Sequence, residues 1–238
     1  MTVRKYGFEM LRFIATFGTA SAVLLSALTA CTTGVSRTVS TSGSGSGSAV
    51  RVGQTFVYEC AVGNPITVRV EGETAWLFLA SGTKSLPHVV SASGVRFSDG
   101  ATSYWNKGAE ASFVLEGQMY SACRNNRARA IWEDAKFRGV DFRAIGNEPG
   151  WHLEIYDDEK VLFTNNYGQD SHQFSFVAPM SDPASRTSRY DLHGDVHRLS
   201  IELEGTACSD SMSGEPFQTR VLLLFDGKEY FGCGRALH

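Results

Sequence analysis

Beyond residue 50 the sequence is divided into short apolar runs, each ended within a few residues by glycine, proline, asparagine or aspartate. Runs of this length, rich in β-branched and aromatic residues, predict β-strands joined by tight turns. Many short strands at such spacing favour an antiparallel barrel or sandwich. We expect strands over residues 55–60, 66–70, 75–79, 111–115 and 118–123, and again over 151–156, 161–164, 173–177, 199–203, 221–225 and 230–233.

One segment between these two groups has a different pattern. Residues 128–138 contain good helix formers with an apolar and an acidic side, and Gly139 follows as a stop signal. We therefore predict a mostly β fold, in which a first antiparallel β domain is joined to a second antiparallel β domain, residues 139–238, by a short helix over 127–138.

The charge of the chain is unevenly distributed. The whole chain carries 22 basic and 25 acidic residues, a net charge of −3, which excludes the strongly basic surface of nucleic-acid-binding proteins. Residues 50–126 contain six basic and six acidic residues, whereas residues 130–238 contain 10 and 18, a net charge of −8. The first expected domain is thus neutral and the second acidic.

The cysteines divide between the two expected domains in the same way. Cys60 and Cys123 lie in the neutral half, and Cys208 and Cys233 lie in the acidic half. Four cysteines allow three pairings, of which pairing within each half is compatible with two independent domains. We predict Cys60–Cys123 and Cys208–Cys233 disulfides, with free thiols as the alternative. No two cysteines have the C-x2-C spacing of a zinc site.

The N-terminal segment predicts export from the cytoplasm. Arg4, Lys5 and Arg12 precede an apolar or small stretch over residues 13–30, which is the pattern of a secretory signal peptide, here residues 1–30. A membrane-spanning helix is the alternative, but the Thr, Ser and Gly residues in this stretch make it a poor hydrocarbon span.

The end of this segment resembles the lipobox of bacterial lipoproteins. Residues 28–31 read Leu-Thr-Ala-Cys, and Leu28 stands where an ordinary signal peptidase requires a small residue. The resemblance implies that Cys31 is acylated and that its lipid anchors the mature protein in a membrane. Thr32 follows instead of an aspartate, which by resemblance to Gram-negative sorting patterns implies the outer membrane, with the protein facing the periplasm.

Residues 31–50 form the expected tether between the lipid and the folded protein. They are mostly Thr, Ser and Gly, with a strict Gly-Ser alternation over 42–48, and such a composition buries too little apolar surface to fold. About 19 residues of this kind have a root-mean-square reach of about 25 Å. This reach suits a protein that meets a diffusing partner.

A motif with fixed spacing in the neutral half is the main indication of function. It consists of Ser93, Gly94 and Phe97, then six residues, then Tyr104, Trp105, Lys107, Gly108 and Ala111. This pattern resembles the signature of the membrane-bound and periplasmic inhibitors of c-type lysozyme, which is Ser-Gly-x-x-Tyr, six residues, then aromatic-Trp-x-Lys-Gly-x-x-Ala. Tyr58 and Cys60 match the Tyr-x-Cys opening of that family's domain. Phe97 departs from the pattern, because the family usually has tyrosine there.

The resemblance covers residues 51–126 and implies a small antiparallel β-barrel that binds c-type lysozyme and inhibits it, without a cofactor and without catalysis. It implies that Ser93 and Lys107 enter the lysozyme cleft, where two catalytic carboxyl groups lie about 5 Å apart. An ammonium group is a compact charge with three donors, and a hydroxyl can donate to a carboxyl group. The predicted lysozyme-binding site comprises these two residues with Gly94, Phe97, Tyr104 and Trp105. Of these, Trp105 is expected to be a core or loop-bracing residue rather than a direct contact.

The acidic half offers weaker candidates. Its segments 146–151, 208–214 and 232–233 resemble an uncharacterised domain family of bacterial envelope proteins, which implies a fold but no activity. His193 and His197 stand four residues apart, a metal-binding spacing on a helix. The glycine and aspartate between them favour a turn instead.

No enzyme motif is complete in this half. Residues 209–213 offer hydroxyls and an acid but no Gly-x-Ser-x-Gly elbow, and Glu148 and Glu154 are expected to be ordinary surface charges. A lysozyme inhibitor is therefore the favoured interpretation. The alternatives are an envelope lipoprotein that binds glycan or a protein partner without inhibition, and an enzyme or metal-handling protein centred on the acidic half.

Overall fold

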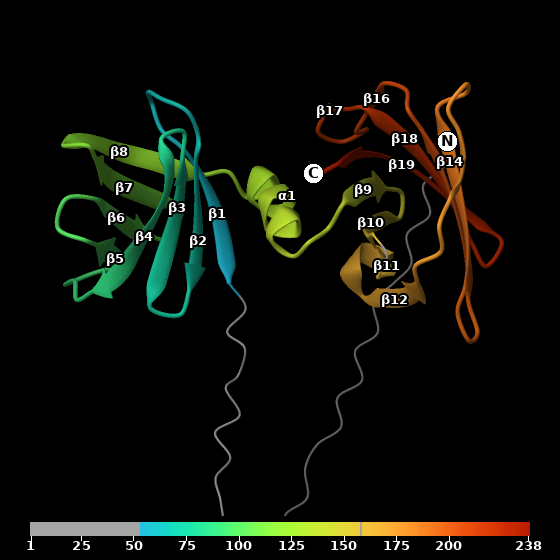
Figure 1. Cartoon of the computed structure of the whole chain (residues 1–238), viewed down its shortest axis with the longest axis horizontal. Coiled ribbons are helices and arrows are strands. Elements are labelled where there is room, and N and C mark those ends of the chain that lie inside the picture. Colours follow the sequence, from blue (N-terminus) through green and yellow to red (C-terminus); the bar gives the residue numbers. More distant parts are fainter. Residues whose placement is uncertain (1–52, 158) are drawn as a thin grey trace, which may run out of the picture. The chain divides into compact units, whose positions relative to one another are not determined.

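The computed structural model describes residues 53–157 and 159–238, all within one compact unit, residues 49–238. The fold is mostly β, as predicted: a closed antiparallel barrel, one α-helix and a second antiparallel sheet (Figure 1). The expected signal peptide, Cys31 and the whole tether of residues 31–50 lie outside the described residues. Within the described ranges, no helix is long and apolar enough to cross a membrane.

The barrel has eight strands, each paired with its neighbours in sequence, and β1 closes it against β8. The strands are β1 (Gln54–Glu59), β2 (Ile66–Glu71), β3 (Thr74–Leu79), β4 (Gly82–Val89), β5 (Val95–Ser98), β6 (Ser103–Lys107), β7 (Glu110–Leu115) and β8 (Gln118–Asn125). Hairpins connect all of them, so the barrel is built from local pairings along the chain.

Aromatic rings fill the interior of the barrel. Tyr104 is fully buried between Phe97 and Phe113, and its ring centroid lies 5.8 Å and 5.2 Å from theirs. Such pairs contribute about 0.5–1.5 kcal/mol each beyond the burial of their surface. Because Phe97 belongs to β5 and Tyr104 to β6, the two motif strands are fixed from the inside by their own aromatic side chains.

Three barrel strands were not predicted from the sequence. β4 includes Pro87, whose missing N–H normally confines proline to edges and bulges. β5 has only four residues, and β6 begins with the buried polar residue Ser103. These segments become strands because both of their neighbours pair with them, which a local apolar pattern does not reveal.

The predicted Cys60–Cys123 disulfide is present and spans 63 residues. Cys60 directly follows β1, and Cys123 lies in β8, so the bond joins the two strands that close the barrel. A link across a loop of this length restricts the unfolded chain and typically stabilises a small domain by about 2–4 kcal/mol.

The predicted helix is α1 (Arg127–Phe137). The Asn126 side chain caps it by accepting from a backbone N–H of the first turn at 3.1 Å. On one side Asp134 accepts hydrogen bonds from Thr55 Oγ1 at 2.9 Å and from Arg69 Nη1 at 3.2 Å, both on the barrel. The helix thus packs on the outside of the barrel through a polar contact.

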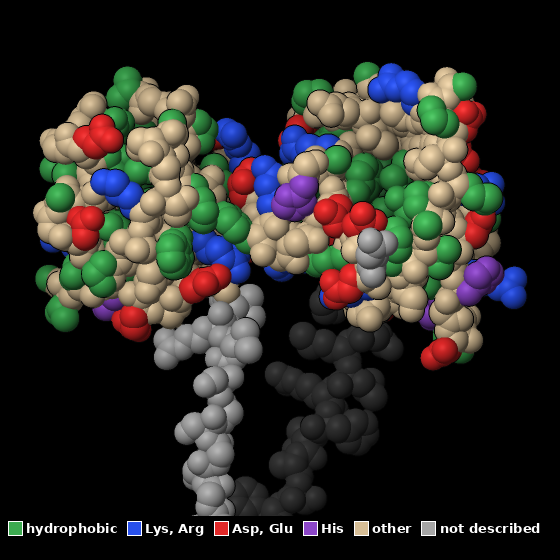
Figure 2. Space-filling view, viewed as in Figure 1, with side chains coloured by type: hydrophobic (Ala, Val, Ile, Leu, Met, Phe, Trp, Pro, Cys, Tyr) green, Lys and Arg blue, Asp and Glu red, His purple; other side chains and the backbone are tan. Residues whose placement is uncertain are grey.

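The second sheet has nine antiparallel strands in the order β12-β11-β10-β9-β19-β18-β15-β14-β13, and it does not close (Figure 1). Its strands are β9 (Phe142–Asn147), β10 (Gly150–Tyr156), β11 (Lys160–Asn165), β12 (Asp170–Ser175), β13 (Met180–Asp182), β14 (Thr187–His193), β15 (Arg198–Glu204), β18 (Thr219–Phe225) and β19 (Lys228–Ala236). A short turn, η1 (Asn166–Gly168), connects β11 to β12. Figure 2 shows apolar side chains in a hollow of this part of the molecule, with acidic side chains beside them.

Three strands of this sheet were also missed in the sequence. Only Leu192 is buried in β14, no residue is buried in β13, and β9 contains a buried arginine. Strands without an apolar face give no alternating pattern, so their position in a sheet follows from pairing alone.

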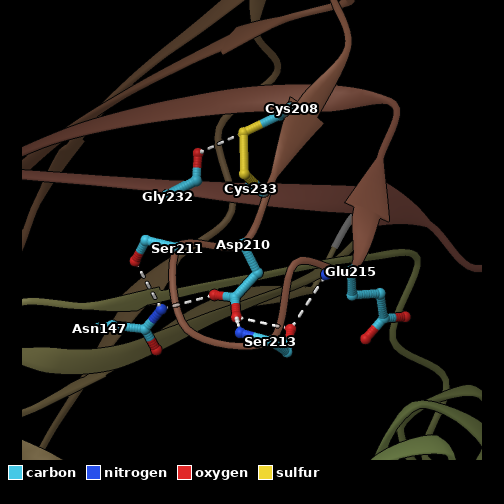
Figure 3. The surroundings of a disulfide bond; sticks show 8 residues. All are labelled: Asn147, Cys208, Asp210, Ser211, Ser213, Glu215, Gly232 and Cys233. Carbon is cyan, nitrogen blue, oxygen red and sulfur yellow. Dashed lines mark hydrogen bonds between the residues drawn. A yellow bond between two sulfur atoms is a disulfide. The ribbon is translucent and has the colours of Figure 1, made fainter.

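The predicted Cys208–Cys233 disulfide is present and joins β16 (Cys208–Ser209) to β19 (Figure 3). The chain after β16 turns around the Asp210 carboxylate before entering β17 (Pro216–Phe217). This carboxylate accepts hydrogen bonds from Asn147 Nδ2 at 2.6 Å and from the backbone N–H and hydroxyl of Ser213, both at 2.7 Å. The barrel and the part of the chain that forms the second sheet thus each contain one disulfide, as the distribution of cysteines predicted.

Candidate functional site

The two loops of the motif meet at one edge of the barrel. Strands β5 and β6 pair with Val95 opposite Asn106, so the chain just before Val95 lies beside the chain just after Asn106. This register places the loop that carries Ser93 next to the end of β6, where Lys107 begins the turn into β7. The structure thus brings together the two residues that the motif singles out.

Trp105 connects these two loops. Its indole Nε1–H donates a hydrogen bond to the Ser93 carbonyl oxygen at 2.8 Å. The Lys107 ammonium lies over the face of the same indole, 3.6 Å from the ring centroid, within the range of a cation–π interaction. One half-buried side chain therefore contacts both loops.

Gly94 and Gly108 each follow a motif residue and adopt left-handed conformations, with φ of +68° and +71°. A Cβ added at Gly94 would lie 2.3 Å from the Asn106 carbonyl oxygen. Position 94 therefore requires glycine both for its conformation and for the close approach of the loop to β6.

The Ser93 hydroxyl and the Lys107 ammonium have no hydrogen-bond or ion-pair partner in the part of the chain that the structure describes. Both residues are exposed. The acidic residue of the turn, Glu110, pairs instead with Arg124 at 3.2 Å. The edge thus presents an ammonium group and a hydroxyl that are free to bind an external acceptor.

Phe97 and Tyr104 lie beneath this edge and are buried, with exposed fractions of 2% and 0%. Tyr104 shares a hydrogen bond of 2.9 Å with the Tyr58 hydroxyl, and Asn106 Nδ2 donates to both hydroxyls. Burial raises the pKa of Tyr58 and of Tyr104, so both phenols stay neutral. Phe97 and Tyr104 can therefore support the site from below, but they offer no surface to a partner.

His193 and His197 belong to a β-hairpin, in line with the expected turn. His193 ends β14, and His197 precedes β15, where its Nδ1 lies 2.6 Å from the Asp226 carboxylate. Among residues 53–157 and 159–238, no three His, Cys, Asp or Glu side chains are grouped so that they could hold a metal ion. The arrangement gives the histidine pair no support as a metal centre.

The expectation that Glu154 is a surface charge is wrong. Glu154 is 3% exposed and accepts two hydrogen bonds of 2.7 Å from the Arg138 guanidinium, together with bonds from Arg143 and from the Tyr156 hydroxyl. Arg143 stands directly opposite it in the β9–β10 register. A cavity of about 680 Å³ borders this cluster, but the Glu154 carboxylate is already saturated by donors, so the cluster is structural.

The hydroxyls of residues 209–213 give no catalytic arrangement. Ser213 donates to the Asp210 carboxylate, and the Ser211 hydroxyl accepts from Asn147 Nδ2 at 3.1 Å (Figure 3). Neither serine has a neighbouring histidine or lysine among its hydrogen-bond partners in this part of the structure. The Asp210 turn therefore shapes the chain between β16 and β17.

Residues 58–121 match the family of the membrane-bound lysozyme-inhibitor of c-type lysozyme. The matched segment begins at Tyr58 and contains the whole spaced motif, so the resemblance predicted from the motif is confirmed for the barrel. Neither the curated proteins nor the solved structures contain a significant match to the chain.

Proposed function

We propose that this protein inhibits c-type lysozyme through the barrel edge that carries Ser93 and Lys107. The family that matches residues 58–121 consists of inhibitors, so the barrel would act by binding rather than by catalysis. The observation that carries the proposal is the exposed ammonium of Lys107 beside an exposed hydroxyl, neither paired within the described protein.

The chemistry of a lysozyme cleft suits these two groups. A retaining glycosidase holds two carboxyl groups about 5 Å apart, and a lysine ammonium can donate to both of them at once. The Ser93 hydroxyl would donate to one of these carboxyl groups. Charge-assisted hydrogen bonds of this kind are about twice as strong as neutral ones, and the inserted side chains would exclude the glycan from the cleft.

The same proposal includes a location in the cell envelope. Cys31 would be acylated, and its lipid would anchor the protein in the outer membrane. The tether of residues 31–50 would hold the barrel in the periplasm within about 25 Å of the lipid. The domain boundaries we propose are 1–30 for the signal peptide, 51–126 for the inhibitor barrel, 127–138 for the helix and 139–238 for the acidic β domain.

The test is a titration of c-type lysozyme with residues 51–238 and with single variants, measured both as inhibition of cell-wall lysis and as binding. Lys107→Ala leaves the carboxyl groups of the cleft unpaired and should weaken binding by about 2–5 kcal/mol, a loss of about 30-fold or more. Ser93→Ala should cost less, about 1–3 kcal/mol. Neither change should lower the melting temperature, because exposed loop residues contribute little to stability.

The matched control is Lys84→Ala, since Lys84 belongs to the same barrel and its ammonium donates to Thr102 Oγ1 at 3.2 Å. This variant should inhibit like the wild type. If Lys107→Ala inhibits as well as the wild type while melting normally, the proposed mechanism is wrong. A wild-type protein that binds cell-wall glycan or another protein but leaves lysozyme active would favour the alternative envelope function.

A further inference from the structure

The Ser93 loop and Lys107 depend on the same side chain for their positions. We infer that Trp105 is a positioning residue that presents both groups to the partner in a fixed relation: its indole N–H holds the Ser93 loop, and its ring face holds the Lys107 ammonium. This inference rests on the proposed function and extends it to a residue that need not touch lysozyme.

The Ser93 loop has few other restraints. Residues 90–94 lie between β4 and β5 and form no strand of their own. Apart from the bond from Trp105, the Ser91 hydroxyl donates to the carbonyl oxygens of Ser93 at 3.2 Å and Gly94 at 3.0 Å, which are bonds within the loop. The indole N–H, by contrast, ties the loop to β6 at 2.8 Å.

Lys107 gains order from the same indole. A lysine side chain is flexible, and fixing it on binding costs conformational entropy. Because the ammonium already lies 3.6 Å from the centroid of the Trp105 ring, its side chain is restricted before the partner arrives. Preorganisation of this kind increases affinity by lowering the entropic cost of association.

Trp105 is itself held firmly enough for this role. It stands in the middle of β6, opposite Arg96 of β5 and Ser112 of β7, so the sheet fixes its backbone on both sides. Gly94 makes room for the indole, because a Cβ there would lie 3.2 Å from Trp105 Nε1. The glycine of the motif and its tryptophan thus form one packing unit.

Two substitutions separate the two contacts. Trp105→Phe keeps an aromatic face for Lys107 but removes the N–H, and it should weaken lysozyme binding by about threefold. Trp105→Leu removes both contacts and should weaken it by about tenfold, in line with the modest size of one exposed hydrogen bond and one cation–π contact. The matched control is Trp76→Leu on β3, an indole that is 40% exposed, which should leave binding unchanged.

A double-substitution cycle distinguishes positioning from mere stability. If Trp105 acts through Lys107, Trp105→Leu should weaken binding by clearly less than tenfold in a Lys107→Ala background, because the group it positions is gone. In the free wild-type protein, the Lys107 side-chain methylene protons should show upfield NMR shifts from the indole ring, and these shifts should vanish in Trp105→Leu.

The outcomes separate this inference from the proposed function. Three results would each overturn the positioning role. They are additive effects of the two substitutions, wild-type affinity in Trp105→Leu, and unshifted Lys107 protons in the free protein. A wild-type protein with the upfield shifts that nevertheless fails to bind lysozyme would overturn the proposed function and the presentation role with it. Unchanged shifts and affinity in Trp76→Leu, together with non-additive loss in the Trp105 series, would support the inference.

Discussion

Two regions of this protein contain a cluster of basic and oxygen-bearing side chains. In one the polar groups are exposed and unpaired, and in the other they are buried and paired. At the barrel edge, Lys107 lies over Trp105 but its ammonium and the neighbouring Ser93 hydroxyl remain exposed and unpaired within the described residues. In the nine-stranded sheet, the carboxylate of the buried Glu154 accepts hydrogen bonds from two arginines and a tyrosine and has no acceptor site left.

This difference distinguishes the cluster that we propose binds a partner from the cluster whose charges are paired within the fold. The Glu154 carboxylate already accepts four hydrogen bonds, so it has no acceptor site left for a ligand. Removing one of its buried partners would destabilise the fold. An exposed cation without a carboxylate contributes little to folding, so it can be used for an external partner. Substitutions in the two regions should therefore affect different quantities.

The largest effect is expected from Glu154→Gln. The substitution leaves the buried Arg143, which is 7% exposed, beside a neutral side chain, and breaking a buried pair in this way typically costs about 3–5 kcal/mol. Denaturant unfolding of residues 51–238 measures the loss, with Glu202→Gln on an exposed position of the same sheet as the control. Equal stability of the two variants would contradict a structural role for the cluster.

The two regions also differ in how far the sequence reveals them. The barrel edge could be predicted, because its motif has fixed spacing and its glycines mark the turns. The buried cluster could not, because Arg143 and Glu154 stand between apolar residues at the positions of β9 and β10 where an alternating strand normally carries its solvent-exposed polar side chains. Only the register that places them opposite each other shows that they compensate one another, and a register is a tertiary property.

The same limit explains the missed strands. β14 has one buried side chain, and β4 contains a proline, so neither carries the local signal of a strand. Phe97 and Tyr104 show the same limit. The motif placed them in the predicted binding site but did not reveal that their side chains are buried inside the barrel. A motif indicates which residues matter but not whether they contact the partner or the core.

Glu154 should also make the stability of the fold depend on pH. Burial alone raises the pKa of Glu154, but the hydrogen bond from Arg138 and the charges of Arg143 and Arg138 outweigh it, so its pKa lies below the ordinary value of 4.5. A lowered folded-state pKa means that the carboxylate stabilises the fold above pH 4.5 and that this contribution is lost as the pH falls through the folded-state pKa.

The stability difference between wild type and Glu154→Gln should therefore be constant near neutral pH and shrink as the solution is acidified below about pH 4.5. Denaturant unfolding of both proteins over an acid series measures it. Lys107→Ala should follow the wild-type curve throughout, because its ammonium is exposed. A difference that does not change with acidification would show that Glu154 stabilises the fold by shape rather than by charge.

The smallest expected effect is that of the acidic residues 139–238 on the rate at which the protein associates with lysozyme. Residues 139–238 contain eight basic and 16 acidic residues, a net charge of 8 − 16 = −8, and c-type lysozymes are generally basic. A charged surface of this kind accelerates the encounter with an oppositely charged protein, and the acceleration fades with salt. The substitutions Asp195→Asn, Glu202→Gln and Glu229→Gln remove three exposed charges and should slow association with lysozyme about two- to threefold at low ionic strength.

Kinetics then separate the contributions of the two domains. Stopped-flow or surface-binding measurements should show that the triple variant changes the association rate and its salt dependence, whereas Lys107→Ala mainly raises the dissociation rate. At high ionic strength the triple variant should associate like the wild type, because exposed charges are then screened within a few ångströms. Equal association rates and equal salt dependence for wild type and triple variant would mean that the acidic domain takes no part in capture, and inhibition would then depend on the barrel edge alone.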